Sequence, residues 1–164
     1  MANKPRWLNR DERRAWLAYI DASTLLGDHL DRQLRRDAGL THADYNLLSR
    51  LSAVPERSLS MSQLAERMKI TRSRLTHAVS RLEQAGYVVR RDHPTDKRGQ
   101  VAELTDEGVA LLAKAAPGHV AAVRQAVFDA LTPEQVHQLA EIGEAISQAL
   151  QHADSDTTPP WRRR

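Results

Sequence analysis

Two short amphipathic patterns, separated by a tight turn, occupy the middle of the chain. Residues 60–68 open with a Ser-x-x-Gln sequence, the usual form of a helix-capping box, and continue with apolar residues at helical spacing. After a two-residue break, Thr71 is a typical cap for a second helix, which should end at Gly86 because glycine tolerates a left-handed helix terminus. The pattern predicts a helix-turn-helix.

A β-hairpin is predicted directly after these helices. Residues 87–91 and 100–104 have the length and the β-favouring side chains of short strands. The segment between them contains Pro94 and Gly99, both of which are turn formers. A hairpin with a long tip after a helix-turn-helix is typical of a winged helix, in which the hairpin is the wing.

Helices are predicted on the amino-terminal side of this element. Apolar residues recur three or four positions apart from Trp16 to Leu34, and this pattern ends before Gly39. A shorter helix should begin at the capping residue Thr41 and end near Pro55. It would support the helix-turn-helix from behind.

Two more helices are predicted on the carboxy-terminal side. The first begins after Thr105, and Pro117 and Gly118 should kink or break it, with two separate shorter helices as the less favoured result. The second begins at Thr132, with proline at the first helical position and glutamine three residues after the cap. The predicted fold is therefore mainly α with a small β-hairpin wing.

Composition indicates one domain without a membrane span. The 164 residues suffice for one hydrophobic core, and no Gly- or Ser-rich linker divides them. Hydrophobic residues make up 41% of the chain, but no apolar run approaches the roughly 20 residues that cross a bilayer. Because the first residues lack the apolar core of a secretory signal, we expect the protein to act in the cytoplasm.

Positive charge is concentrated in the predicted recognition element. Residues 69–98 contain eight Lys and Arg against three Asp and Glu, a net charge of +5, whereas the whole chain has a net charge of +3. The remaining residues, with sixteen basic and eighteen acidic side chains, have a net charge of −2. The basicity thus belongs to one element and not to a generally basic surface, and such a local excess favours a specific contact with nucleic acid.

One face of the second helix carries hydrogen-bond donors and no acidic residue. Its members are Arg72, Ser73, Arg74, Thr76, His77 and Arg81. A major groove admits a helix with such a face, and Arg98 at the hairpin tip suits a narrow minor groove. Any one of these arginines taken alone can equally be a solvated surface residue.

Catalysis and metal binding find little support in the sequence. There is no cysteine, which excludes disulfides and thiolate metal sites, and the seven histidines form no closely spaced pair. The sequence leaves open only a metal site assembled from histidines that are distant in the chain. The Ser, His and Asp residues follow capping and surface patterns instead of a nucleophile-and-base cluster. We expect neither a cofactor nor an enzymatic activity.

Three motifs resemble the multiple-antibiotic-resistance regulator (MarR) family of bacterial winged-helix repressors. The most specific is the run 92–99 followed by Leu-Thr-x-x-Gly at 104–108, which is similar to the family's wing signature. Residues 64–66 and 81–86 are similar to its two helix signatures. The resemblance implies a sequence-specific DNA-binding regulator. Because the family is one of repressors, it also implies that this regulator is a repressor.

The resemblance also assigns roles to individual residues. It places Ser73 and Arg74 at the bases, with His77 one turn later and Arg98 in the minor groove. An arginine can bond two acceptors on a guanine edge, so Arg74 is the strongest candidate for base reading. The remaining arginines of the recognition helix more naturally hold phosphates.

The terminal helices admit two interpretations, because an amphipathic stripe can pack in the chain's own core or against a second copy. The resemblance implies the second, with residues 11–37 and 105–150 as dimerisation helices around a winged element at 41–104. The polar ends, residues 1–10 and 152–164, should be flexible tails. A homodimer would read a pseudo-palindromic operator with half-sites about one turn of duplex, or roughly 34 Å, apart.

A ligand site is implied by the resemblance alone. In the family, small aromatic or amphipathic anions bind between the dimer region and the winged element. Trp16, Tyr19 and Tyr45 are the aromatic residues best placed to line such a site, although the simpler interpretation makes them core residues. The alternative function is a winged-helix protein-protein interaction module whose arginine-rich helix meets an acidic partner instead of DNA.

Overall fold

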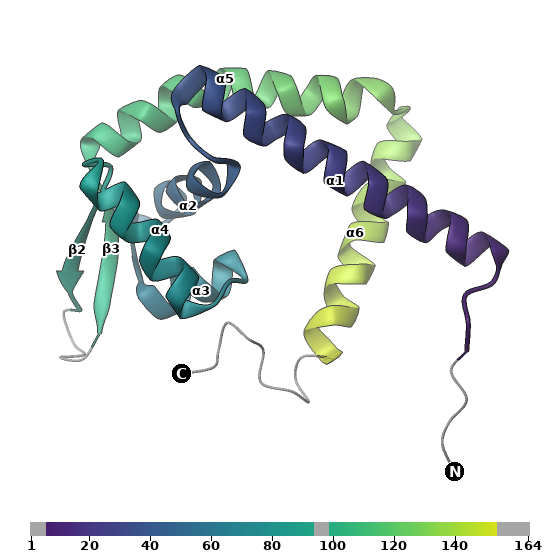
Figure 1. The fold of residues 1–164 in the computed structure, drawn as a ribbon, viewed down its shortest axis with the longest axis horizontal. Coiled ribbons are helices and arrows are strands. Elements are labelled where there is room, and N and C mark those ends of the chain that lie inside the picture. Colours follow the sequence, from purple (N-terminus) through teal and green to yellow (C-terminus); the bar gives the residue numbers. More distant parts are fainter. Residues whose placement is uncertain (1–5, 94–98, 154–164) are drawn as a thin grey trace, which may run out of the picture.

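Helices dominate the computed structural model, which describes residues 6–93 and 99–153 (Figure 1). In chain order the elements are α1 (Arg10–Ala38), α2 (His42–Ser52), a short 3-10 turn (Pro55–Arg57), β1 (Ser58–Ser60), α3 (Met61–Met68), α4 (Arg72–Gln84), β2 (Val88–Asp92), β3 (Gln100–Leu104), α5 (Asp106–Ala126), a second 3-10 turn (Phe128–Ala130) and α6 (Pro133–Ala153). The prediction of a mainly helical protein with a small wing is confirmed. Arg98 and most of the predicted tails lie outside the described residues.

The predicted helix boundaries follow from local side-chain bonds. Thr41, Ser60 and Thr71 each accept a hydrogen bond from the backbone amide three residues later, which satisfies an amide that the helix itself leaves free. Gly39 ends α1 in the left-handed conformation, with φ +69°. Gly86 is also left-handed, at φ +81°, and lies two residues after the end of α4.

The sheet has three antiparallel strands in the order β1-β3-β2. The predicted hairpin is present, with Val88 opposite Leu104 and Asp92 opposite Gln100, so that β2 begins one residue later than expected. Strand β1 was not predicted, because a strand of three residues is too short to display an alternating pattern.

The predicted interruption of the helix after Thr105 is wrong in one respect, since α5 runs without a break through Pro117. A proline removes the hydrogen bond to the carbonyl four residues earlier. Here Pro117 and Ala113, which carries that carbonyl, are both exposed, so water can solvate the freed oxygen. Figure 1 shows α5 as one helix that passes over the winged element.

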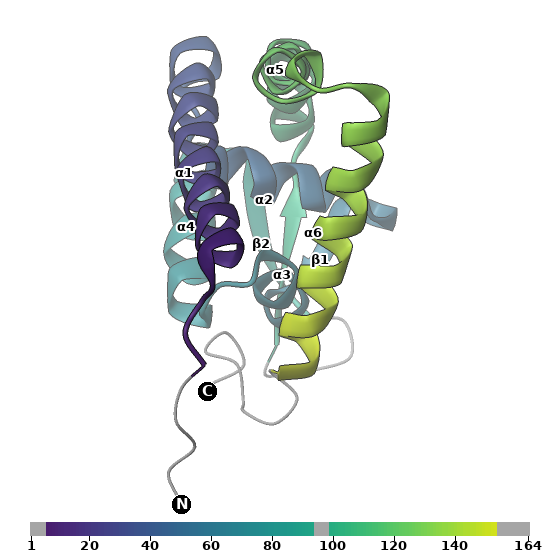
Figure 2. The same cartoon turned by 90° about the vertical axis from the view of Figure 1, so that its right-hand side faces the viewer.

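The hydrophobic core lies inside the winged element. Its fully buried side chains include Leu47, Leu48, Leu51, Leu64, Leu75 and Val79, and α1 and α5 add Leu34 and Ala115 to the same cluster. The helices at the two ends of the chain, in contrast, leave many apolar side chains exposed. In Figure 2, α1 and α6 descend on either side of α5, and both helices expose large apolar side chains, among them Trp16, Leu17, Tyr19, Leu25, Leu139, Ile142 and Leu150. Across the described ranges, no helix is both long and apolar enough to span a membrane.

Candidate DNA-binding interface

Helix α4 presents the predicted donor face to solvent. Leu75, Val79 and Leu82 anchor its opposite face in the core. All six predicted residues of the helix are exposed: Arg72, Ser73, Arg74, Thr76, His77 and Arg81. The structure therefore brings these six side chains to the outer surface of one helix, as the sequence predicted.

The amino end of α4 is fastened to α3 by its own side chains. Arg72 donates a hydrogen bond from Nη2 to the Ser62 hydroxyl, at 2.6 Å. The Thr76 hydroxyl donates to the backbone carbonyl of Arg72, at 2.9 Å. The bond to Ser62 holds Arg72 across the helix-turn-helix, whereas the Thr76 bond lies within α4. Ser73, Arg74 and His77 lie on the exposed surface beside Arg72.

A polar groove of about 410 Å³ separates this end of α4 from the wing. It is lined by residues of α3, α4 and the two hairpin strands, among them Ser62, Arg72, Thr76, Arg90 and Gln100. Among the described residues that line it there are two arginines and no acidic side chain, so the groove suits an anionic backbone.

The wing is braced by ion pairs that sequence reasoning missed. Arg90 of β2 donates from Nε and Nη2 to the Glu83 carboxylate of α4, at 2.8 and 2.5 Å, and the Arg90 amide donates to the same carboxylate at 3.0 Å. These hydrogen bonds lower the pKa of Glu83 below its ordinary value. Arg91 pairs with Glu103 on the neighbouring strand, at 2.6 Å. The first pair fixes the direction of the wing relative to α4.

Arg81 differs from the other residues of the donor face. Its Nη2 lies 2.5 Å from Oδ1 of Asp44 at the start of α2, and the Asp44 side chain is only 6% exposed. The two residues are 37 positions apart, and nothing in the local sequence indicates the pair. Arg81 was predicted to hold a phosphate, but its guanidinium is already paired with Asp44 within the protein.

The three aromatic candidates for a ligand site occupy two separate environments. Tyr45 is part of the core, and its ring lies 4.3 Å from that of His119 on α5. Trp16 and Tyr19 lie on the amino-terminal half of α1, half-exposed, with 6.4 Å between their ring centroids. Within the described ranges no group of three or more His, Cys, Asp or Glu residues is arranged to hold a metal ion.

Comparison with known proteins agrees with this architecture. The sequence profile of the MarR family matches residues 38–99. The chain is also 30% identical over 136 residues to the HTH-type transcriptional repressor YetL of Bacillus subtilis, a match that covers 80% of each protein. The chain belongs to the MarR family.

Two solved structures of this family from Streptomyces coelicolor are similar over nearly the whole chain. Sco3205, crystallised in complex with DNA, has 56% sequence identity and a TM-score of 0.92, covering 98% of this chain and 99% of that one. AbsC has 36% identity and a TM-score of 0.85, covering 90% and 99%. The protein is a MarR-family transcriptional regulator with a winged helix that binds DNA, and it is not an enzyme.

Proposed function

We propose that this MarR-family regulator is a homodimeric repressor that reads a pseudo-palindromic operator and is released by a small ligand. The observation that carries the proposal is the exposed donor face of α4, which stands beside the polar groove and the braced wing. A helix of this kind fits the major groove, and the wing then reaches along the duplex.

The proposed contacts divide into base reading and backbone binding. Arg74 reads a guanine edge, with Ser73 and His77 as neighbouring contacts, because all three are exposed on the same side of α4. Arg72 and Thr76 border the groove beside the wing and hold phosphates. Arg98 remains the proposed minor-groove contact.

A second copy of the chain is the proposed partner of the terminal helices. Trp16 and Leu17 on α1 and Ile142 and Leu150 on α6 are each at least half exposed in the single chain, and covering them would remove large apolar surfaces from water. Residues 105–150 contain six acidic and two basic side chains, so this arm is repelled by DNA and lies away from it. Two recognition helices would then face one side of the duplex.

Repression and ligand control are the finer parts of the proposal. The relative YetL is named as a repressor, which supports the same sign of regulation here. Of the three predicted aromatic contacts, Trp16 and Tyr19 are exposed together on α1, whereas Tyr45 is packed in the core. Trp16 and Tyr19 are therefore the proposed contacts of a small aromatic or amphipathic anion, which would shift the dimer between DNA-competent and DNA-incompetent forms. Because its target is duplex DNA, we place its action in the cytoplasm.

Fluorescence anisotropy with a duplex selected by the protein from a random pool tests this function. We expect a preference for the selected duplex over a scrambled one that survives about 150 mM salt. Arg98→Ala should weaken binding to both duplexes and lower the salt slope by about one counterion per subunit. Equal binding of both duplexes by the parent protein would contradict sequence-specific regulation and would favour a protein-binding module.

A further inference from the structure

Asp44 is a buried carboxylate at the start of α2, and its hydrogen bonds reach two parts of the winged element. Its Oδ2 accepts from the Thr41 hydroxyl at 2.6 Å and from the Thr41 amide at 3.2 Å, which completes the capping box of α2. Its Oδ1 accepts from Arg81 of α4, at 2.5 Å. A carboxylate that is 6% exposed needs such partners, because an unpaired buried charge is strongly destabilising.

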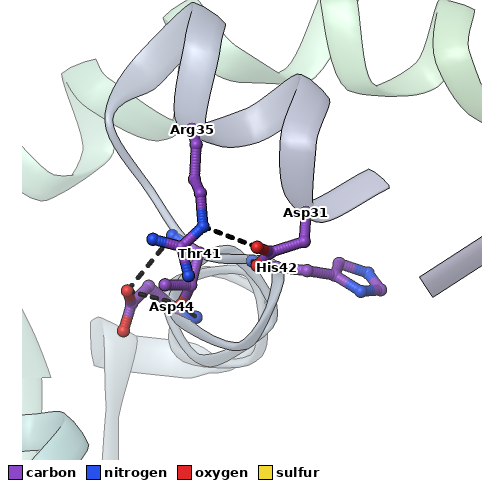
Figure 3. Close-up of polar contacts among 5 residues, drawn as sticks. All are labelled: Asp31, Arg35, Thr41, His42 and Asp44. Atoms are coloured by element: carbon purple, nitrogen blue, oxygen red, sulfur yellow. Dashed lines mark hydrogen bonds and ion pairs between the residues drawn. The ribbon is translucent and has the colours of Figure 1, made fainter. Parts of the chain in front are cut away.

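The same turn of α2 is also tied to α1. Oδ1 of Asp31 accepts from the backbone amide of His42 at 2.9 Å, and Oδ2 of Asp31 accepts from Arg35 Nε at 2.5 Å (Figure 3). Figure 3 shows these groups gathered where α1 passes into α2, with the Asp44 side chain beside the capping residue Thr41. The first turn of α2 is therefore bonded to α1 on one side and, through Asp44, to the recognition helix on the other.

We infer that Asp44 is a positioning residue, which acts through Arg81 to fix the angle of the recognition helix relative to α1, one of the proposed dimerisation helices. The inference rests on the proposed function, since the angle matters only if two recognition helices must meet two half-sites together. It also assigns Arg81 a new role, as an internal anchor in place of a phosphate contact.

The position of Arg81 makes such an anchor effective. Arg81 lies nine residues after Arg72, or about 14 Å along the helix axis at 1.5 Å per residue. A rotation of about 10° around the anchored end would move the base-reading end by roughly 2 Å over that length. Apolar packing of Leu75 and Val79 is not directional, whereas the hydrogen-bonded ion pair between the half-exposed Arg81 and the buried Asp44 has fixed donor and acceptor atoms.

Asp44→Asn separates this role from a direct contact, because the two predict opposite results. If Arg81 held a phosphate and Asp44 competed for it, removal of the Asp44 charge would strengthen DNA binding. If Asp44 positions α4, the same change weakens binding to a full operator by about tenfold and changes binding to a single half-site less than twofold, since only the full operator needs both helices at a set distance.

The experiment measures the Kd of the full-length protein on the duplex selected by the parent and on a duplex with one half-site. Arg81→Ala is the second variant, and it should reproduce the loss on the full operator without lowering the salt slope. Asp129→Asn is the matched control, because it removes a carboxylate from an exposed pair with Arg124 outside the winged element.

Thermal melts followed by circular dichroism select a temperature at which every variant is folded. Stronger binding by Asp44→Asn, or a salt slope lowered by about one counterion per subunit in Arg81→Ala, would overturn the inference.

A measurement without DNA distinguishes failure of this inference from failure of the proposed function. The sequence has no cysteine, so Ser73→Cys gives a single spin-label site at the exposed end of α4. Pulsed dipolar spectroscopy should give one narrow distance in the parent dimer and a broader distribution in Asp44→Asn. An unchanged distribution in Asp44→Asn would overturn the positioning role alone. Absence of a dipolar signal in the parent would overturn the homodimer, and the positioning role with it.

Discussion

Gly108, in the first turn of α5, lies against the backbone of the residue that precedes β2. The Thr105 hydroxyl accepts from the Gly108 amide at 3.1 Å, and the Thr105 amide donates to the Tyr87 carbonyl at 3.1 Å. A Cβ at position 108 would overlap that Tyr87 carbonyl oxygen and the Leu104 side chain. The glycine of the Leu-Thr-x-x-Gly motif thus permits close contact between α5 and the base of the wing.

Gly108→Ala should therefore lower the free energy of unfolding by about 1 to 3 kcal/mol, because a backbone carbonyl cannot move aside as a flexible side chain can. Chemical denaturation followed by circular dichroism measures this change. Lys114→Ala, at an exposed position of the same helix, should change stability by no more than about 0.5 kcal/mol. Equal stability of the parent protein and Gly108→Ala would show that the contact has no such role.

Some residue roles were predictable from the sequence because their partners are near in the chain. The capping oxygens of Thr41, Ser60 and Thr71 bond amides only three residues away, so composition and spacing reveal them. The partners of Arg81 and Arg90 were not predictable in this way. Arg81 meets Asp44 only after α2 and α4 have packed together, and Arg90 reaches Glu83 only after the chain has turned into the wing.

At the scale of elements, the contact of α5 with α1 and α2 centres on His119. Its ring lies near Tyr45 and 5.7 Å from the His42 ring, and its Nδ1 is 3.4 Å from Oε1 of the buried Gln33. Burial, and then the neighbouring His42, lower the pKa of His119 below its ordinary value of 6.5. The neutral ring is therefore the form that the folded protein favours.

The free energy of unfolding should consequently decrease as the pH is lowered below about 6.5. Because the pKa of His119 is lower in the folded than in the unfolded protein, its full contribution is present above pH of about 6.5 and is lost as the pH falls from there toward the folded pKa. Melting temperatures between pH 7.5 and 5.5 should fall less steeply in His119→Gln than in the parent. His137→Gln, at an exposed site on α6, is the control. Identical slopes for the parent and His119→Gln would refute this role of His119.

Element prediction succeeded where a pattern was long and failed where it was short or depended on solvent. The stripes of α1 and α6 extend over many turns, and both helices are present. Strand β1 has only three residues, and its pairing of Leu59 with Ala102 depends on a strand far along the chain. The sequence could not show that Ala113 and Pro117 would both be exposed to water, which is why a kink or a break in α5 was expected.

At the scale of the whole molecule, apolar faces at both ends of the chain lack cover within one copy. Ile142 is 56% exposed and Leu150 is 61% exposed on α6, and Trp16 is 53% exposed on α1. The sequence predicted these stripes but could not decide between an internal core and a second copy. Their exposure in the single chain favours the second copy.

Ile142→Asp should dissociate the homodimer, because it places a carboxylate in a surface that a partner would bury. Sedimentation velocity at micromolar concentration should show a dimer for the parent and a monomer for the variant, and operator binding should be lost with the dimer. Gln148→Asp adds the same charge on the opposite face of α6 and should leave the dimer intact. A monomeric parent, or a dimeric Ile142→Asp protein, would contradict this assembly.

Methylation interference on the selected operator can locate the base edge that α4 reads, and so tests whether α4 lies in the major groove. Methylation of guanine N7 in the major groove removes an acceptor that an arginine uses. For the parent protein, we expect binding to be blocked by N7 methylation of a guanine in each half-site, about one helical turn apart. For Arg74→Ala, we expect this block to disappear while overall affinity falls. Binding by the parent that no guanine methylation impairs, or an unchanged interference pattern in Arg74→Ala, would contradict the placement of α4 in the major groove.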